Sequence, residues 1–189
     1  MNYKKEPYPK NLKELIKISD EVGQKVTLAL CHKDCATLRE LYDQRDKKNY
    51  IKNNIFERMN CPPNTKRTLK CKSHNEIKGI YVFGELERTS GKVIPIYVGI
   101  SRTVCKRLRN HGWGKLHNQA TLAYLISAHK KKHKGRRIEL DKNIFIKAQR
   151  LIQKYKVVII PVEHDYDLHF MEAYLSGRLR TKWNSFKTH

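Results

Sequence analysis

Two apolar segments separated by a short polar stretch place the strongest constraint on how this chain can fold. Residues 79–86 and 93–99 are rich in β-branched and aromatic side chains, and the six residues between them, 87–92, are polar and include a glycine. Such a pattern is typical of two antiparallel strands joined by a turn. The sequence therefore predicts a β-hairpin over residues 79–99.

The register of this hairpin decides which side chains meet across it. A turn centred on Thr89 places Tyr81 and Tyr97 directly opposite one another on the same face of the sheet. Pro95 lies in the second strand and has no N–H to donate to a strand ladder. We therefore expect a bulge or a free edge at Pro95.

After the hairpin the hydrophobic residues recur mainly at helical spacing. The patterns predict helices over residues 103–111, 119–129, 144–155 and 168–179, the last with Asp167 as its N-cap. Between the last two helices, the apolar run 157–162 indicates a buried central strand.

The first 78 residues have a different character. Apolar residues at helical spacing predict one helix from Leu12 to Val26, and a second helical pattern begins at Leu38. Pro62 and Pro63 would break any helix, and the chain up to residue 75 is typical of a connecting segment. We expect two regions: a helical N-terminal region, residues 1–78, that supplies dimer or DNA contacts, and a second domain, residues 79–189.

The charge of the chain points to a polyanionic partner. The chain has 189 residues with 40 Lys and Arg against 18 Asp and Glu, a formal net charge of +22. Residues 1–78 hold 18 basic and 10 acidic side chains, whereas residues 79–189 hold 22 and 8. An excess of this size repels itself in an isolated compact protein, so nucleic acid is the leading partner. Charge alone does not distinguish a nucleic-acid enzyme from a protein that only binds.

Several features bear on where such a protein works. No apolar run approaches the roughly 18 residues that a membrane-spanning helix needs, and the N-terminus lacks the apolar stretch of a secretion signal. Cys31, Cys35, Cys61 and Cys71 could in principle furnish thiolates for a structural zinc, but their spacing is not that of a zinc ribbon. We therefore expect ordinary reduced cysteines in a cytoplasmic protein that does not enter a membrane.

The scarcity of carboxylates limits the chemistry. Hydrolysis of a phosphodiester requires an activated water, stabilisation of the extra negative charge and help for the leaving oxygen, and a carboxylate-bound divalent cation commonly supplies part of this. Residues 79–189 contain only eight Asp and Glu, and no pair has the spacing of a two-metal site. A nuclease centre in this chain would use one metal, and phenol, guanidinium and amide groups would supply the remaining help with water activation, charge stabilisation and departure of the leaving oxygen.

One enzyme family uses that combination, and its motifs are present in order. Gly79-Ile80-Tyr81 is followed by Tyr97-Val98-Gly99, by a helix with Arg107 and His111, by Glu172 and by Asn184. Over about residues 79–186 the chain resembles the GIY-YIG nuclease superfamily. The resemblance implies an α+β fold, a small three-stranded and mainly antiparallel sheet flanked by helices, here with a helical N-terminal extension.

The resemblance also implies roles for these side chains. Tyr81 would orient or deprotonate the attacking water, with its pKa lowered by Arg107, His111 and the metal, and Tyr97 would contact phosphate or water. Arg107 would clamp the scissile phosphate in bidentate fashion, and His111 would hydrogen-bond Tyr81 or accept its proton. Glu172 would hold a single Mg²⁺, for which Mn²⁺ could substitute. Asn184 would fix backbone geometry or contact a phosphate.

The details lean toward the restriction enzymes of this superfamily. The hairpin is long, and a histidine, His111, stands four residues after Arg107, where many repair nucleases of the family carry tyrosine. Ile100 departs from the pattern, because many members have a polar or basic residue there. A type II restriction enzyme would cut double-stranded DNA as a homodimer and would have a companion DNA methyltransferase encoded nearby, without a stable complex.

Three other functions stay open at this point: a structure-specific repair or recombination nuclease, a mobile-element (homing-type) nuclease, and a catalytically inert DNA-binding module. In each case basic side chains would contact DNA, and the loop after residue 129 is the densest group. The candidate DNA-binding residues are Arg102, Lys106, Arg109, Lys130, Lys131, Lys132, Lys134, Arg136 and Arg137.

Overall fold

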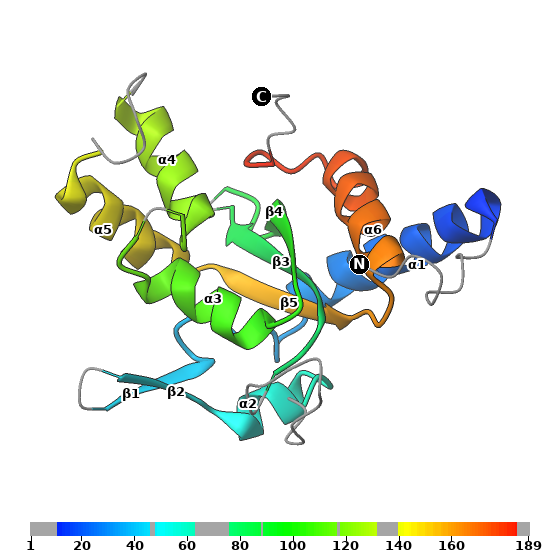
Figure 1. The fold of residues 1–189 in the computed structure, drawn as a ribbon, viewed down its shortest axis with the longest axis horizontal. Coiled ribbons are helices and arrows are strands. Elements are labelled where there is room, and N and C mark those ends of the chain that lie inside the picture. Colours follow the sequence, from blue (N-terminus) through cyan, green and yellow to red (C-terminus); the bar gives the residue numbers. More distant parts are fainter. Residues whose placement is uncertain are drawn as a thin grey trace, which may run out of the picture.

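The computed structural model describes residues 11–45, 48–62, 76–87, 89–116, 118–131 and 140–184. Its helices and strands form an α+β fold (Figure 1). In chain order they are α1 (Leu12–Cys31), β1 (Tyr42–Arg45), β2 (Lys48–Ile51), α2 (Asn53–Arg58), β3 (Gly79–Leu86), β4 (Val93–Ser101), α3 (Val104–Trp113), α4 (Thr121–Lys131), α5 (Lys142–Ile152), β5 (Lys156–Pro161) and α6 (Asp165–Arg178).

The central sheet has three antiparallel strands in the order β4-β3-β5. The β-hairpin over residues 79–99 is therefore confirmed, but the prediction that residues 157–162 form the central strand is wrong, because β3 lies between β4 and β5. The run of valine and isoleucine in β5 reflects burial on both faces of the sheet. Its outer edge is covered as well, since Val157 N–H donates to the carbonyl of Ala36 and Thr37 bridges to Lys156.

The register of the hairpin differs from the one predicted. Tyr81 pairs with Gly99, and Tyr97 pairs with Phe83, so the two tyrosines are diagonal neighbours and not directly opposite. They still share one face, with ring centroids 6.3 Å apart. The pairing shifts by one residue between Phe83 and Gly84, where Pro95 lies, and this confirms the irregularity expected at that proline.

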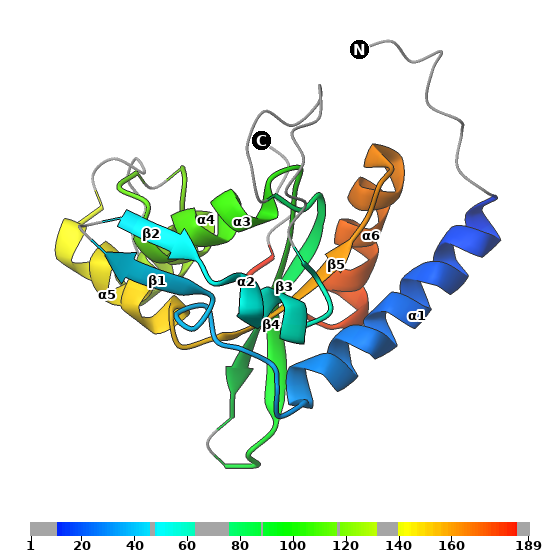
Figure 2. The same cartoon turned by 90° about the horizontal axis from the view of Figure 1, so that it is seen from below.

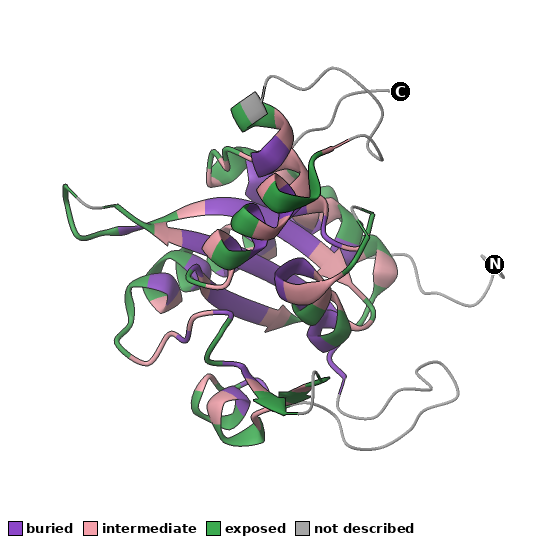
Figure 3. Cartoon of the chain, turned by 90° about the vertical axis from the view of Figure 1, so that its left-hand side faces the viewer, coloured by how far each residue is buried: buried purple, intermediate pink, exposed green. Residues whose placement is uncertain are grey.

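The alternation of side chains along β3 divides the core into two halves. Tyr81 and Phe83 face a cluster built with α3, α4 and α5, whereas Ile80 and Val82 face a cluster built with α1 and α6. Figures 1 and 2 show α1 and α6 together at one side of the sheet and α3, α4 and α5 at the other. In Figure 3 the strands of the central sheet are largely buried, while the turn between β3 and β4 extends into solvent.

The N-terminal region is only partly helical. Asn11 caps α1, with its side chain accepting from Glu14 N–H at 3.1 Å. The helical pattern predicted from Leu38 is wrong, because residues 42–51 form the β1–β2 hairpin. This hairpin is tied to the rest of the fold by Tyr42, whose buried hydroxyl donates to the carbonyl of Cys105 at 2.6 Å. A strongly polar, four-residue strand carries little periodic signal, which explains the error.

The helices after the hairpin lie close to their predicted positions. One detail differs: α6 begins at Asp165 with His164 as N-cap, so Asp167 lies in the first turn and does not cap the helix. None of the helices among the described residues is both long enough and apolar enough to cross a lipid bilayer.

Candidate active site

Three predicted residues meet between β3 and α3. Tyr81 lies in the middle of the central strand, and Arg107 and His111 lie one turn apart on the face of α3 that covers it. The hydroxyl of Tyr81 lies 2.9 Å from Nε2 of His111, and Nε of Arg107 donates to the same oxygen at 3.4 Å. Tyr81 and His111 are almost completely buried.

Gly99 makes room for the phenol ring. Gly99 lies directly across the ladder from Tyr81, and the Tyr81 ring lies over it. A β-carbon at residue 99 would come within 2.9 Å of Tyr81 Cε2 and closer still to Cζ and the hydroxyl oxygen. Any side chain larger than hydrogen would push the hydroxyl away from His111. The glycine of the second triplet therefore has a steric role that the sequence pattern alone did not reveal.

Protein oxygens already engage most of the Arg107 guanidinium. Nη1 donates to the carbonyls of Gln119 at 3.2 Å and Asn118 at 3.5 Å, and Nη2 donates to Thr121 Oγ1 at 3.0 Å. With Nε directed at Tyr81, four of the five N–H groups have protein acceptors. The Arg107 guanidinium is therefore not free to bind a phosphate through two N–H groups, because a phosphate would first have to displace one of these acceptors. Asn118, Gln119 and Thr121 were missed by sequence reasoning.

The imidazole of His111 is neutral. Burial, and then the nearby positive charge of Arg107, hold the pKa of His111 well below its usual range. Its Nδ1 atom is buried without a hydrogen-bond partner among the described residues. A proton on Nδ1 would be a buried unsatisfied donor, so the favoured tautomer carries its proton on Nε2 and donates to Tyr81. Of the two α3 side chains expected to lower the pKa of Tyr81 by charge, only Arg107 is charged.

Burial dominates the acidity of both tyrosines. It raises the pKa of Tyr81 well above that of a free phenol, while the charge of Arg107 and its hydrogen bond act in the opposite direction. The pKa of Tyr97 is also raised, first by burial, and Arg107 again opposes the shift. At rest both phenols are protonated near neutral pH.

Glu172 approaches this cluster from α6. Its carboxyl is half-buried, and burial raises its pKa, opposed by the charges of His169 and Arg107. Its negative charge in turn contributes to the raised pKa of Tyr81 and Tyr97. Within the described residues its carboxylate makes no hydrogen bond or ion pair, and no group of three or more His, Cys, Asp or Glu could together hold a metal. An unpaired, partly desolvated carboxylate fits a hard divalent cation that keeps most of its waters.

Asn184 is committed to the backbone of β4. Its amide oxygen accepts from Val98 N–H at 2.7 Å, and its Nδ2 donates to the Val98 carbonyl at 2.8 Å. Thr181 Oγ1 donates to the same amide oxygen at 2.8 Å, and Trp183 N–H donates to the carbonyl of Ile96 at 3.0 Å. The side chain therefore acts like a further strand residue on the open edge of β4, beside Tyr97. Of the two roles considered for Asn184, the contacts favour fixing the backbone.

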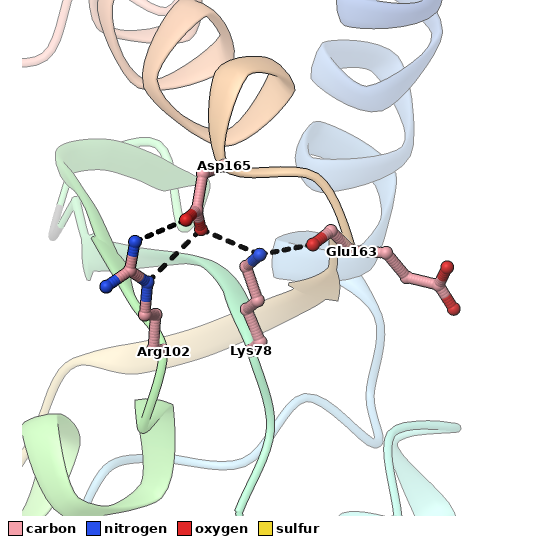
Figure 4. Close-up of polar contacts among 4 residues, drawn as sticks. All are labelled: Lys78, Arg102, Glu163 and Asp165. Atoms are coloured by element: carbon pink, nitrogen blue, oxygen red, sulfur yellow. Dashed lines mark hydrogen bonds and ion pairs between the residues drawn. The ribbon is translucent and has the colours of Figure 1, made fainter. Parts of the chain in front are cut away.

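Two further carboxylates that were not predicted hold these elements in place. Buried Glu76 accepts the N–H groups of Cys105 and Lys106 at 3.1 Å each and so anchors the first turn of α3. Asp165, at the start of α6, binds Lys78 at 2.7 Å and accepts from Arg102 Nε at 3.2 Å (Figure 4).

The Asp165 cluster connects the three elements that carry Tyr81, Arg107 and Glu172. Lys78 comes just before β3, and Arg102 comes just before α3. Lys78 also donates to the carbonyl of Glu163, in the loop that leads to α6 (Figure 4). Arg102 was predicted to contact DNA, but here its guanidinium is engaged by Asp165. The ion pairs hold the ends of the three elements together.

The other predicted DNA contacts fall into two groups. Lys106 and Arg109 are exposed on the outer side of α3, and Lys130 is exposed near the end of α4. The backbone of Lys131 ends α4, without a described side chain. The remaining four lie outside the described residues: Lys132, Lys134, Arg136 and Arg137.

The cysteines considered for zinc lie in different parts of the fold. Cys31 ends α1 and Cys35 packs against the half of the core with α1 and α6, whereas Cys61 belongs to the other half. Each of these three is a free thiol, and burial raises the pKa of Cys61 to about 11. Cys71 lies outside the described residues.

No protein-family model matches the chain, and searches among curated protein sequences and among solved structures found no match.

Proposed function

We propose that this protein is a Mg²⁺-dependent endonuclease that hydrolyses phosphodiester bonds of double-stranded DNA. The observation that carries the proposal is the contact of Tyr81 with both His111 and Arg107, with the half-buried carboxylate of Glu172 nearby. These are the residue types that the GIY-YIG resemblance implies, and they come together from β3, α3 and α6. The formal charge of +22 supports a polyanionic substrate.

In this proposal Tyr81 releases its own proton to bulk solvent when substrate and cation bind, and the resulting phenolate positions the attacking water and takes a proton from it. His111 Nε2–H and Arg107 Nε–H both point at the phenol oxygen, so each stabilises the phenolate more than the phenol. Because His111 is neutral, it helps as a hydrogen-bond donor and orients the ring. Burial of Tyr81 excludes competing water but also opposes ionisation.

Arg107 stabilises the extra negative charge of the transition state. Its guanidinium is held by main-chain carbonyls and by Thr121, so it is oriented before substrate arrives. The guanidinium also interacts with the Tyr97 hydroxyl, so a phosphate oxygen would gain an N–H by replacing either this contact or the 3.5 Å contact with Asn118. A preorganised cation costs no reorganisation during the reaction.

Glu172 is the residue that would hold the metal. When bound there, Mg²⁺ supplies positive charge that stabilises the leaving oxygen. Glu172 itself contributes one carboxylate ligand from a half-buried position on α6. Asn184 keeps the edge of β4, and therefore Tyr97, in place beside the phosphate.

We further propose that the enzyme is a sequence-specific type II restriction enzyme acting in the cytoplasm as a homodimer. The histidine one helical turn after Arg107 and the long β3–β4 hairpin support this reading. A palindromic duplex site presents two equivalent strands, and a two-fold dimer supplies one active centre to each.

The proposal is tested by incubating the protein with unmodified plasmid and phage DNA, with Mg²⁺ or with EDTA. We expect discrete fragments with Mg²⁺ and intact DNA with EDTA. Preference for branched DNA would instead indicate a repair or recombination nuclease. Absence of cleavage at every salt concentration would contradict the enzyme proposal and leave a binding protein.

Two variants and two matched controls test the residue roles. Glu172→Gln and Arg107→Ala should abolish cleavage while DNA binding stays measurable. Glu163→Gln removes an exposed carboxylate that points away from the Asp165 cluster (Figure 4), and Arg58→Ala removes an exposed guanidinium from α2. Both controls should cleave DNA. Normal cleavage by Glu172→Gln or by Arg107→Ala would show that the roles are assigned wrongly.

A further inference from the structure

The outer face of α5 carries a row of exposed side chains that the proposed active site does not use. Asn143, Lys147 and Arg150 lie in α5, and Lys154 lies in the turn directly after it; all four are exposed, at intervals of four, three and four residues. This spacing places the three helical members on one side of α5, and Lys154 continues the row beyond its C-terminal end. The opposite side of α5 packs into the core through Phe145 and its neighbours. Lys147, Arg150 and Lys154 are called the α5 stripe below.

In the part of the chain that the structure describes, the α5 stripe has no acidic partners. Within the described residues, none of its three side chains forms an ion pair, and exposed α5 positions include no Asp or Glu. The surrounding segment carries a large excess of positive charge, because residues 104–154 hold 14 Lys and Arg against two Asp and Glu. By contrast, Arg102 and Arg178 near the ends of α6 are both paired with carboxylates.

The α5 stripe is rigidly connected to the helix that carries Arg107. Gln149 Nε2 donates to the carbonyl of Gly114, and Gln153 Nε2 donates to the carbonyl of Gly112, each at 2.8 Å. Both carbonyls are at the C-terminal end of α3. A ligand bound along α5 is therefore held in a fixed relation to α3.

A groove lies beside the α5 stripe. It has a volume of about 340 Å³ and is lined by Gln44 of β1, Trp113 of α3 and Arg150 of α5, among others. In Figure 2 the β1–β2 hairpin lies in front of α5 and α3. At the tip of the hairpin Lys48 is exposed and extends the positive surface beyond the groove, whereas Arg45 is paired with Asp43 at 2.7 Å.

We propose that the α5 stripe binds the sugar–phosphate backbone of duplex DNA outside the scissile phosphate and so aligns the duplex with Arg107. This inference rests on the proposed DNA substrate and deepens it. Lys154 is seven residues after Lys147, which corresponds to about 10 Å if the rise of about 1.5 Å per residue in α5 continues through the turn that follows it. One DNA strand presents a phosphate every ~3.4 Å of its axis, so a stripe of this length spans about three phosphates.

The test is the salt dependence of DNA binding. The triple variant Lys147→Gln, Arg150→Gln and Lys154→Gln is compared with wild type by fluorescence anisotropy, on a labelled 20-base-pair duplex in EDTA, across a series of KCl concentrations. The slope of log K against log salt is negative, and each lost phosphate contact lowers its magnitude by about 0.9. We expect the magnitude of the slope to fall by about 2–3, while the single-turnover cleavage rate at saturating DNA with Mg²⁺ stays within about twofold of wild type, because the stripe does not reach the reacting atoms.

The matched control removes the same charge elsewhere. Lys13, Lys17 and Lys25 are exposed on α1, at the other side of the sheet (Figure 1). Changing all three to Gln should leave the slope unchanged. An unchanged slope in the α5 variant, or an equal fall in both variants, would overturn this inference without touching the proposed function. Absence of any duplex binding by the wild-type protein would overturn both.

Discussion

Gly99→Ala should disable the site through a single methyl group. The structure places Gly99 directly across from Tyr81, and a β-carbon there would lie 2.9 Å from Cε2 and nearer still to the end of the ring. Ordinary contacts between carbon atoms are about 3.5–4.0 Å, so the ring has to move by about 1 Å. The buried strand leaves little space for that movement, since Tyr81 is only 1% exposed.

The geometry sets the size of the effect. A shift of about 1 Å breaks the 2.9 Å contact between the Tyr81 hydroxyl and His111 Nε2. Overpacking of a well-packed core costs about 1–3 kcal/mol in the free energy of unfolding. A displacement of about 1 Å in a reacting group costs about 100-fold in rate. We therefore expect a protein that still folds, with a modest loss of stability and a severe loss of cleavage.

Urea unfolding and single-turnover cleavage of plasmid DNA measure the two effects separately. Gly177→Ala is the matched control, because Gly177 is an exposed helical residue whose added β-carbon would meet nothing within 4 Å. That variant should be more stable by up to about 1 kcal/mol and should cleave normally. Wild-type stability and wild-type cleavage by Gly99→Ala would refute the steric argument. Wild-type cleavage with reduced stability would refute the role of Tyr81.

Two other perturbations follow from the contacts around the site. Thr121→Val removes the acceptor of Arg107 Nη2 and should lower kcat about tenfold with little change in KM. Thr121→Ser keeps the hydroxyl and should restore kcat. A fully active Thr121→Val variant would contradict the positioning role of Thr121. The ion pairs to Lys78 and Arg102 hold the pKa of Asp165 below its usual value, so their stabilising contribution is present above about pH 4 and is lost as the pH falls below it. Asp165→Asn should therefore lose about 1 kcal/mol of stability at pH 7 in urea unfolding and much less near pH 3, whereas a difference that is independent of pH would exclude an ionic origin.

The sequence was sufficient to predict the elements of the fold that have strong periodic patterns. The β3–β4 hairpin and the helices after it follow from residue types and spacing. The register did not follow, because it depends on the one-residue shift opposite Pro95, whose position no side-chain pattern specifies. The order of the strands did not follow either, because β5 is as apolar at an edge as it would be at the centre.

The candidate site was predictable from the sequence only for side chains whose residue type and spacing form a motif. Arg107 and His111 share a helix face, and their meeting with Tyr81 was expected. The carbonyls of Asn118 and Gln119 that hold Arg107 belong to the main chain, so no residue type marks them. The neutral state of His111 results from its burial, and burial is a property of the folded chain. Asp165 carries no motif at all, and only the fold brings it to Lys78 and Arg102.

The electrostatics of the resting site explain why its few charged groups can suffice. Burial keeps the phenol of Tyr81 protonated and His111 neutral, so Arg107 is the one cation in direct contact with the phenol oxygen among the described residues. The charge of Glu172 makes ionisation of Tyr81 harder, although Glu172 makes no hydrogen bond to it within that same part of the chain. Any cation that neutralises Glu172 would therefore also favour the phenolate, and in the proposed mechanism this couples metal binding to the acidity of Tyr81. The proposed centre would need only one carboxylate, because its base would become available when substrate and cation arrive together.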